Sequence, residues 1–280
     1  MKIGVTGATG QLGSLVVEQL KARTSAENIV ALVRTPEKAE GLGVEARKFD
    51  YEKPEELAAS LAGIDRLLLI SGSEIGQRAR QHGNVIAAAK EAGVKWIVYT
   101  SLLHAETSSL NLAGEHVATE QALKASGLEI TILRNGWYTE NYTGSIAGAL
   151  GAGAFVGSAG NGKISSATRA DFAEAAAVAV LDENNKGQVY ELAGDKAYTL
   201  TDLAAEISKQ SGKDIPYNNL PENEYAQILK SIGLPEAFAD AIASWDTGAS
   251  KDDLFDDSKQ LSKLIGRPTT SLADAVAAAL

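Results

Sequence analysis

The sequence contains no cysteine and only three histidines. Without cysteine the chain forms no disulfide, uses no thiolate nucleophile and holds no Cys-ligated zinc or iron–sulfur centre. His82, His104 and His116 are 22 and 12 residues apart, so no pair has the i, i+4 spacing of metal-binding histidines on a helix. We therefore expect no metal site. His104 follows a predicted strand, where it is either a local acid or a structural residue.

Long apolar runs and clusters of basic residues are also missing. The longest apolar run, Ala175 to Leu181, has seven residues, whereas a membrane span needs about 18. The N-terminus has no signal-like apolar region. Basic residues are fewer than acidic ones, 26 against 36, and form no block, which argues against a broad nucleic-acid-binding face and leaves room only for a local basic groove. We expect a cytoplasmic protein with neither membrane nor nucleic acid as a partner, and a homodimer is left open.

The two halves of the chain differ in charge. Residues 1–140 carry 15 basic and 17 acidic side chains, whereas residues 141–280 carry 11 and 19. An anionic ligand therefore meets less repulsion on the first half.

In the first half, short β-rich runs alternate with segments of helical periodicity. In the segment after the first run, Leu12, Leu15, Val16 and Leu20 share one helical face. This rhythm predicts an α/β fold, a doubly wound Rossmann-type parallel sheet covered by helices on both faces. The expected strands are 2–6, 29–33, 44–49, 66–70, 95–100 and 129–133, and the later helices are 55–61, 84–91 and 115–125.

The rhythm breaks near residue 143. Seven glycines lie between Gly144 and Gly162, which predicts a flexible connection around Phe155 and Val156. A helix over 171–181 and a strand over 188–192 follow. We divide the chain into a Rossmann domain, residues 1–142, and a smaller, mainly helical substrate-side lobe, residues 143–280, that is interleaved with the first domain and covers the carboxyl edge of its sheet.

A glycine-rich loop follows the first predicted strand and opens the first helix. Gly7 permits the tight turn, Gly10 lets backbone N–H groups approach a pyrophosphate, and Gly13 lets the helix lie close to the sheet. The alternative is a turn whose glycines serve packing alone. In the first interpretation the loop that binds a dinucleotide consists of Gly7, Ala8, Thr9, Gly10, Gln11, Leu12 and Gly13.

The end of the second strand indicates which dinucleotide is bound. Arg34 follows the strand directly, and no acidic residue precedes Glu37. An acidic residue there selects NAD, whereas an arginine accommodates the 2′-phosphate of NADP. We expect NADPH as the cofactor, unless Arg34 is simply a solvated strand end. Further along, Asp50 is a candidate acceptor for the adenine amine, and the small residues Ser71, Gly72 and Ser73 let the cofactor approach.

The residues 6–13, 33–34, 99–101 and 133–142, the last reading LRNGWYTENY, resemble the NmrA-like group of atypical short-chain dehydrogenases. Within it they look like the bacterial type 2 NAD(P)H:quinone oxidoreductases, and the triphenylmethane dye reductases share much of the pattern. The resemblance extends over the whole chain. It implies that a quinone, a small aromatic acceptor, binds between this segment and the C-terminal lobe. It also implies contacts to the nicotinamide end from Asn135, Gly136, Trp137, Tyr138, Thr139 and Glu140.

The sequence departs from the larger dehydrogenase family at the usual proton donor. None of its eight tyrosines has lysine four residues later, so the Tyr-x-x-x-Lys pair is absent, and the corresponding helix offers His116 and Glu120 instead. A quinone needs little acid assistance, because hydride addition gives a stabilised hydroquinone anion. We therefore expect direct hydride transfer without flavin, governed by proximity and orientation.

Asn135 and Tyr138 are our candidates for orienting the carbonyl oxygens, and Trp137 or Tyr142 for stacking on the ring. The alternative is that these residues form a buried aromatic cluster under the connecting loop.

Two arginines, Arg78 and Arg80, lie near a predicted helix start, where the helix dipole disfavours cations. They indicate either an anionic ligand or, as we prefer, a solvated face. Two other functions stay open. One is an NADP(H)-sensing regulator without turnover, and the other is reduction of azo or triphenylmethane dyes.

Overall fold

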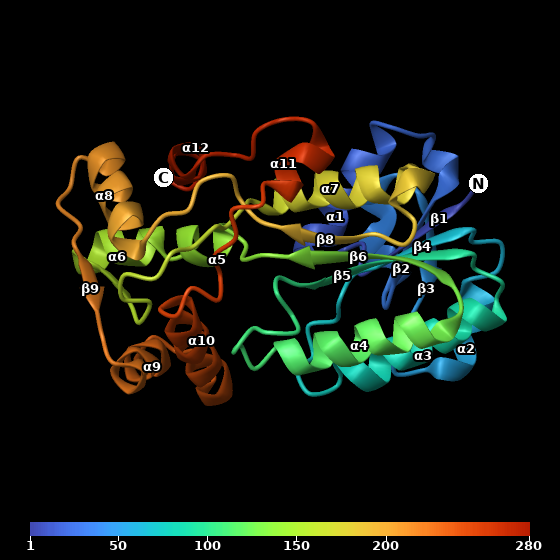
Figure 1. Cartoon of the computed structure of the whole chain (residues 1–280), viewed down its shortest axis with the longest axis horizontal. Coiled ribbons are helices and arrows are strands. Elements are labelled where there is room, and N and C mark those ends of the chain that lie inside the picture. Colours follow the sequence, from blue (N-terminus) through green and yellow to red (C-terminus); the bar gives the residue numbers. More distant parts are fainter.

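A computed structural model describes all 280 residues of the chain. Its main element is a seven-stranded parallel sheet in the order β3-β2-β1-β4-β5-β6-β8 (Figure 1). The strands are β1 (Ile3–Thr6), β2 (Ile29–Val33), β3 (Glu45–Lys48), β4 (Arg66–Leu69), β5 (Trp96–Leu102), β6 (Glu129–Asn135) and β8 (Val189–Leu192). Four of them, β1, β2, β4 and β5, are buried along their whole length, as expected for parallel strands covered on both faces.

Helices cover both faces of this sheet (Figure 1). One face packs against α1 (Gln11–Lys21), α7 (Arg169–Leu181) and α11 (Gln260–Ile265), and the other against α2 (Pro54–Ser60), α3 (Arg78–Glu91) and α4 (Ala113–Ser126). Each face has its own apolar core. The predicted Rossmann-type fold is confirmed.

The rest of the chain forms a smaller, mainly helical part beyond the sheet (Figure 1). Its two short strands, β7 and β9, pair in parallel. None of the helices of the protein combines the length and the apolar character needed to cross a bilayer. The remaining elements are α5 (Glu140–Thr143), α6 (Ile146–Ala152), β7 (Phe155–Gly157), α8 (Leu200–Ser211), β9 (Tyr217–Asn219), α9 (Glu222–Ser231), α10 (Glu236–Ala249), α12 (Leu272–Ala277), and the 3₁₀ turns η1 (Ala26–Asn28), η2 (Pro36–Leu42) and η3 (Glu183–Asn185).

Two details of the sequence interpretation were wrong. The glycine-rich segment 144–162 is not an irregular connection, because it contains α6 and β7. Some of its glycines permit close packing: a Cβ atom on Gly162 would lie 1.9 Å from the Ala249 carbonyl oxygen. The helix expected over 84–91 begins six residues earlier, at Arg78.

Segments from the second half of the sequence lie beside the large sheet. Strand β8 pairs with β6, and α7 packs against α1. The chain after residue 143 is thus shared between the sheet and the smaller part. A division into two domains at that residue stays a prediction.

Candidate active site

A cavity of about 610 Å³ opens at the carboxyl ends of β1, β2 and β4. The strand order reverses direction at this point, between β1 and β4, and such a switch point is where open α/β sheets bind ligands. The residues that line the cavity are Gly7, Thr9, Gly10, Gln11, Leu12, Gly13, Leu32, Val33, Arg34, Thr35, Lys38, Phe49, Asp50, Tyr51, Ile70, Ser71, Gly72, Ser73, Glu74, Arg78, Gln81, Tyr138 and Arg169.

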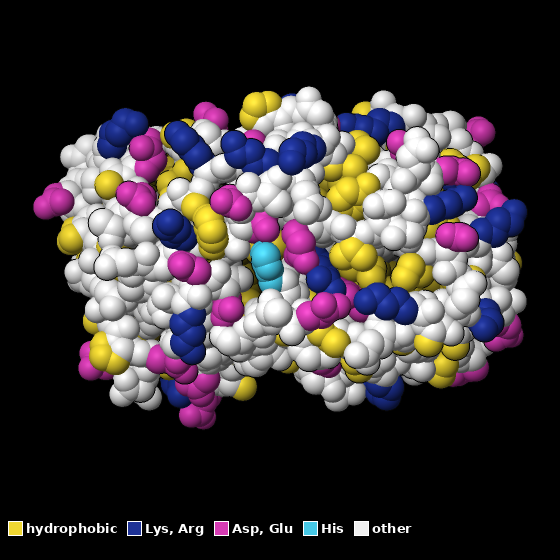
Figure 2. Space-filling view, in the orientation of Figure 1, with side chains coloured by type: hydrophobic (Ala, Val, Ile, Leu, Met, Phe, Trp, Pro, Cys, Tyr) yellow, Lys and Arg dark blue, Asp and Glu magenta, His cyan; other side chains and the backbone are white.

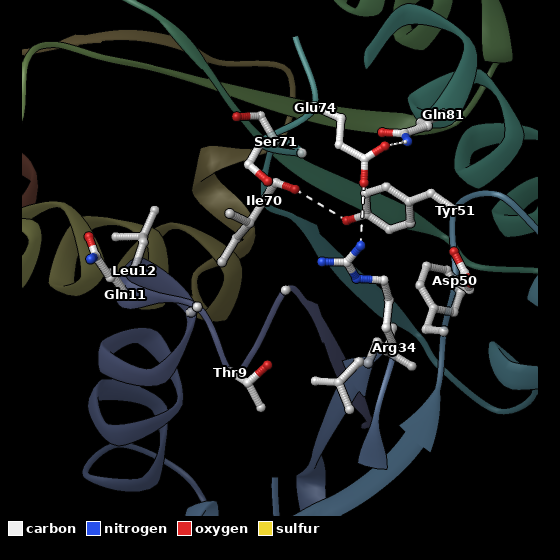
Figure 3. A pocket seen from close by; sticks show the side chains of 18 of the residues that line it. Thr9, Gln11, Leu12, Arg34, Asp50, Tyr51, Ile70, Ser71, Glu74 and Gln81 are labelled. Atoms are coloured by element: carbon white, nitrogen blue, oxygen red, sulfur yellow. Dashed lines mark hydrogen bonds and ion pairs between the residues drawn. The ribbon is translucent and has the colours of Figure 1, made fainter. Parts of the chain in front are cut away.

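The glycine-rich loop forms one wall of the cavity, at the N-terminus of α1 (Figure 3). Gly7 has a φ of +59°, which a residue with a side chain rarely adopts. A Cβ atom on Gly13 would lie 2.2 Å from the Gly7 carbonyl oxygen, so the helix can approach this closely only with glycine there. No side chain caps α1. Its first N–H groups are therefore available to a pyrophosphate. Ala8 is the exception in the predicted loop, since its side chain is buried in the core.

Positively charged side chains line the cavity at the end of β2. Arg34 is 71% exposed, and its Nη1 lies 3.3 Å from Oε1 of Glu74 across the cavity (Figure 3). Lys38, on the 3₁₀ turn η2, also lines this part of the cavity. The sequence reasoning missed Lys38, although its position four residues after Arg34 is a signal. Asp50 lines the cavity as well.

Hydrogen bonds from the sheet and helices fix the loop after β4. The N–H of Ser71 donates to Thr100 Oγ1, and the N–H of Gly72 donates to His82 Nε2 at 3.0 Å. His82 Nδ1 lies 2.9 Å from Thr119 Oγ1. Burial and the nearby charge of Arg78 lower the pKa of His82 to about 4, so the ring is neutral at pH 7. Ser71, Gly72 and Ser73 all line the cavity.

Tyr138 follows β6, on the other side of the switch point from β2, and lines the cavity there. Its ring stacks edge-on to Phe172, at 5.3 Å between centroids, and Arg169 lies over it at 4.5 Å. Burial raises the pKa of Tyr138. The hydroxyl is therefore protonated at pH 7. Asn135 is buried, and neither its Oδ1 nor its Nδ2 makes a hydrogen bond within the protein.

The neighbours of Asn135 and Tyr138 in the sequence point elsewhere. Gly136 donates its N–H to Leu192, Trp137 packs edge-on to Trp245, and the Thr139 hydroxyl contacts that of Ser166. Glu140 accepts a hydrogen bond from the Arg169 N–H. Tyr142, the other stacking candidate, donates to Asp246 at 3.0 Å. Of the residues 135–142, only Tyr138 lines the cavity.

Two arginines near the start of α3 have different surroundings. Arg80 is half-exposed and pairs with Glu52, which fits the solvated face that we expected. That interpretation was wrong for Arg78, which lines the cavity and donates from Nε to the Gly72 carbonyl at 2.6 Å. Sequence reasoning also missed further lining residues, among them Tyr51, Glu74, Gln81 and Arg169, which lie on segments far from the glycine loop in the sequence.

The remaining candidate residues take part in structural contacts. The buried His116 contacts the Tyr99 hydroxyl through Nδ1 at 2.8 Å. Buried Glu120 pairs with Arg134 at 2.7 Å. His104 lies 3.2 Å from Asp256. No group of three or more potential ligands is arranged to hold a metal ion.

Comparison with known proteins identifies the family. Residues 7–183 match the model of the NAD(P)H-binding family. The chain belongs to this family. Over 98% of its length it is 58% identical to quinone oxidoreductase 2 of Escherichia coli strain K12, covering 97% of that protein. The family that the sequence predicted is thereby confirmed.

Solved structures give the same result. The chain is similar to the Escherichia coli NADPH-dependent quinone oxidoreductase in complex with NADPH, with a TM-score of 0.96 at 58% identity and 99% of each chain covered. It is also similar to the triphenylmethane reductase of a Citrobacter species in complex with NADP(H), with a TM-score of 0.96 at 40% identity over the whole of both chains.

Proposed function

We propose that the protein is an NADPH-dependent reductase of quinones. The observation that carries this proposal is a cavity lined by the glycine-rich loop, Arg34, Lys38 and Tyr138, in a chain 58% identical over nearly its full length to a quinone oxidoreductase. The family relation and the cavity therefore support the same activity.

The residues of the cavity fit NADPH. The first turn of α1 would hold the pyrophosphate, because no side chain caps its N–H groups. Arg34 and Lys38 would hold the 2′-phosphate, since both lie at the end of β2 where an NADP-binding fold places this group. When bound, NADPH supplies a hydride from C4 of its nicotinamide.

Asn135 and Tyr138 are the residues that we assign to the acceptor end. The Tyr138 hydroxyl is a protonated donor, and both polar atoms of the Asn135 amide lack partners in a buried site. A buried amide without partners is costly unless a ligand satisfies it. These two groups orient the carbonyl oxygens of the quinone. Hydride passes from NADPH directly to the quinone, without a flavin or a metal. A cytoplasmic location and a homodimer stay predictions.

Stopped-flow mixing tests this function. Purified protein is mixed with NADPH and a series of small quinones, including 1,4-benzoquinone and menadione, with no flavin added. We expect NADPH absorption to fall at a saturable, protein-dependent rate, while the protein itself has no flavin absorption. NADPH binding without oxidation by any quinone would contradict the proposal and favour a sensor of NADP(H).

A further inference from the structure

Arg78 carries a partly buried guanidinium that forms no ion pair with a carboxylate. Its Nε donates to the Gly72 carbonyl at 2.6 Å, but its buried Nη1 makes no hydrogen bond, and no carboxylate lies within ion-pair distance of the guanidinium. Glu115, whose negative charge acts on Arg78, accepts hydrogen bonds from the backbone N–H groups of Arg78 and Gly76, each at 2.9 Å. A buried charge is stable only when it is paired and hydrogen-bonded. This guanidinium therefore has unused capacity for a ligand oxygen.

Apart from Glu115, whose carboxylate accepts from two backbone N–H groups and acts on Arg78 through its charge, the titratable side chains around Arg78 are neutral. Burial lowers the pKa of His82 to about 4 and that of His116 to about 3. Burial also raises the pKa of Tyr99, whose hydroxyl contacts His116. These groups belong to α3, α4 and β5, which pack around the guanidinium. None of them compensates its charge.

The position of Arg78 separates it from the groups that would hold the phosphates. Arg34 and Lys38 follow β2, and the pyrophosphate position is at the first turn of α1. Arg78 is close enough to Tyr138 for the two to interact electrostatically. Tyr138 is the residue that we assigned to the acceptor.

We propose that Arg78 donates a charge-assisted hydrogen bond from Nη1 to the quinone oxygen on which negative charge develops. This inference rests on the proposed function. Two-electron reduction by hydride leaves one quinone oxygen as an anion, while NADPH is oxidised to NADP⁺, and a proton from water then completes the hydroquinone. A preorganised donor in a dry site stabilises such charge more in the transition state than in the ground state.

The first test is kinetic. Arg78→Gln removes the charge, Arg78→Lys keeps it in another geometry, and Arg80→Gln changes an exposed arginine on the same helix. We expect Arg78→Gln to lower kcat for quinone reduction about 100-fold, Arg78→Lys to lower it less, and Arg80→Gln to leave it unchanged. The Kd for NADPH, measured by fluorescence titration, should stay within about twofold in all three, because the residue does not hold the phosphates.

A second test detects the positive charge of Arg78 without catalysis. 4-Nitrophenol, whose absorption distinguishes phenol from phenolate, is titrated into the NADP⁺-loaded protein at several pH values. We expect the wild type to lower the pKa of the bound phenol by about one unit relative to Arg78→Gln, a tenfold change in the phenolate ratio. Arg80→Gln should behave as the wild type does.

The outcomes separate this inference from the proposed function. A wild type that oxidises no NADPH with any quinone would contradict the proposed function. An active wild type with unchanged kcat in Arg78→Gln would overturn the role of Arg78 alone, as would a raised Kd for NADPH at constant kcat. Failure of 4-nitrophenol to bind the wild type, or an equal phenol pKa in both proteins, would also count against it.

Discussion

Arg34 and Glu74 form an ion pair across the cavity, with Nη1 and Oε1 3.3 Å apart (Figure 3). The pair joins the end of β2 to the loop after β4, and Glu74 also accepts a hydrogen bond from Gln81 at 2.9 Å. A 2′-phosphate and the Glu74 carboxylate would both bind the guanidinium of Arg34, so a phosphate that pairs with Arg34 must displace Glu74. The pair therefore affects both the affinity for NADPH and the preference for it over NADH.

Removing the guanidinium should reduce the preference for NADPH. In Arg34→Ala we expect the Kd for NADPH to rise about 10- to 100-fold, the loss of one charge-assisted hydrogen bond, and the Kd for NADH to change by less than about threefold. Fluorescence titration with both dinucleotides measures this, and Arg80→Ala is the exposed-arginine control. An equal loss for both dinucleotides would refute the assignment of Arg34 to the 2′-phosphate.

Removing the competing carboxylate should have the opposite effect. In Glu74→Gln the amide keeps nearly the same shape but no longer pairs with Arg34 as an ion, so we expect NADPH to bind several-fold more tightly and NADH no more tightly. The side chains are exposed, so the gain should shrink between about 0.05 and 0.5 M salt as charges are screened. Unchanged NADPH affinity at low salt would show that Glu74 does not compete.

Oppositely charged side chains are interspersed elsewhere on the surface too, and no broad area of one sign covers the face shown in Figure 2. The first half of the sequence is less negatively charged than the second, but this difference would affect an anionic ligand locally, through Arg34, Lys38 and Arg78 in one cavity. Counting charges over half the chain indicated which half binds an anion, but not which cationic side chains contact that anion.

The sequence predicted those parts of the site whose geometry is local. A glycine loop between a strand and a helix has one arrangement, and residues directly after parallel strands, such as Arg34, Asp50 and Ser71, meet at one edge of the sheet. The sequence did not distinguish Ala8 from the loop residues that line the cavity, because only the folded turn places its side chain in the core.

Other parts of the site depend on contacts that only the folded chain makes. Arg169 reaches the cavity from the start of α7, more than 150 residues after the glycine loop. Gly157 carries no side chain because a Cβ atom there would lie 2.6 Å from Oδ2 of Asp246, on α10. Without that partner a glycine-rich segment predicts a flexible loop, which is why α6 and β7 were missed.

The close approach of α1 to the loop gives a prediction for Gly13. In Gly13→Ala the new Cβ atom would meet the Gly7 carbonyl oxygen at 2.2 Å, so we expect a loss of about 1–3 kcal/mol in the free energy of unfolding and weaker NADPH binding. Gly83, inside α3, faces open space, since no other part of the protein comes within 4 Å of where its Cβ atom would lie. Gly83→Ala should therefore stabilise the protein by about 0.5–1 kcal/mol. Urea unfolding of both variants measures this, and equal effects would contradict the packing argument.

Buried His82 makes the stability of the protein depend on pH. Its pKa is lowered to about 4 by burial and by the charge of Arg78, so the unfolded chain, with an ordinary histidine pKa near 6.5, binds more protons below that value. Protonation of His82 in the unfolded chain therefore leaves the free energy of unfolding unchanged above about pH 6.5. It lowers that free energy progressively as the pH falls from 6.5 towards 4. His82→Gln can still accept from Gly72 and donate to Thr119 but does not titrate. Between pH 7 and pH 5 we expect the wild type to lose about 2 kcal/mol more unfolding free energy than His82→Gln, measured by urea unfolding at each pH. Other titrating groups are common to both proteins and cancel in the difference, so parallel pH curves would mean that His82 is not held neutral in the folded protein.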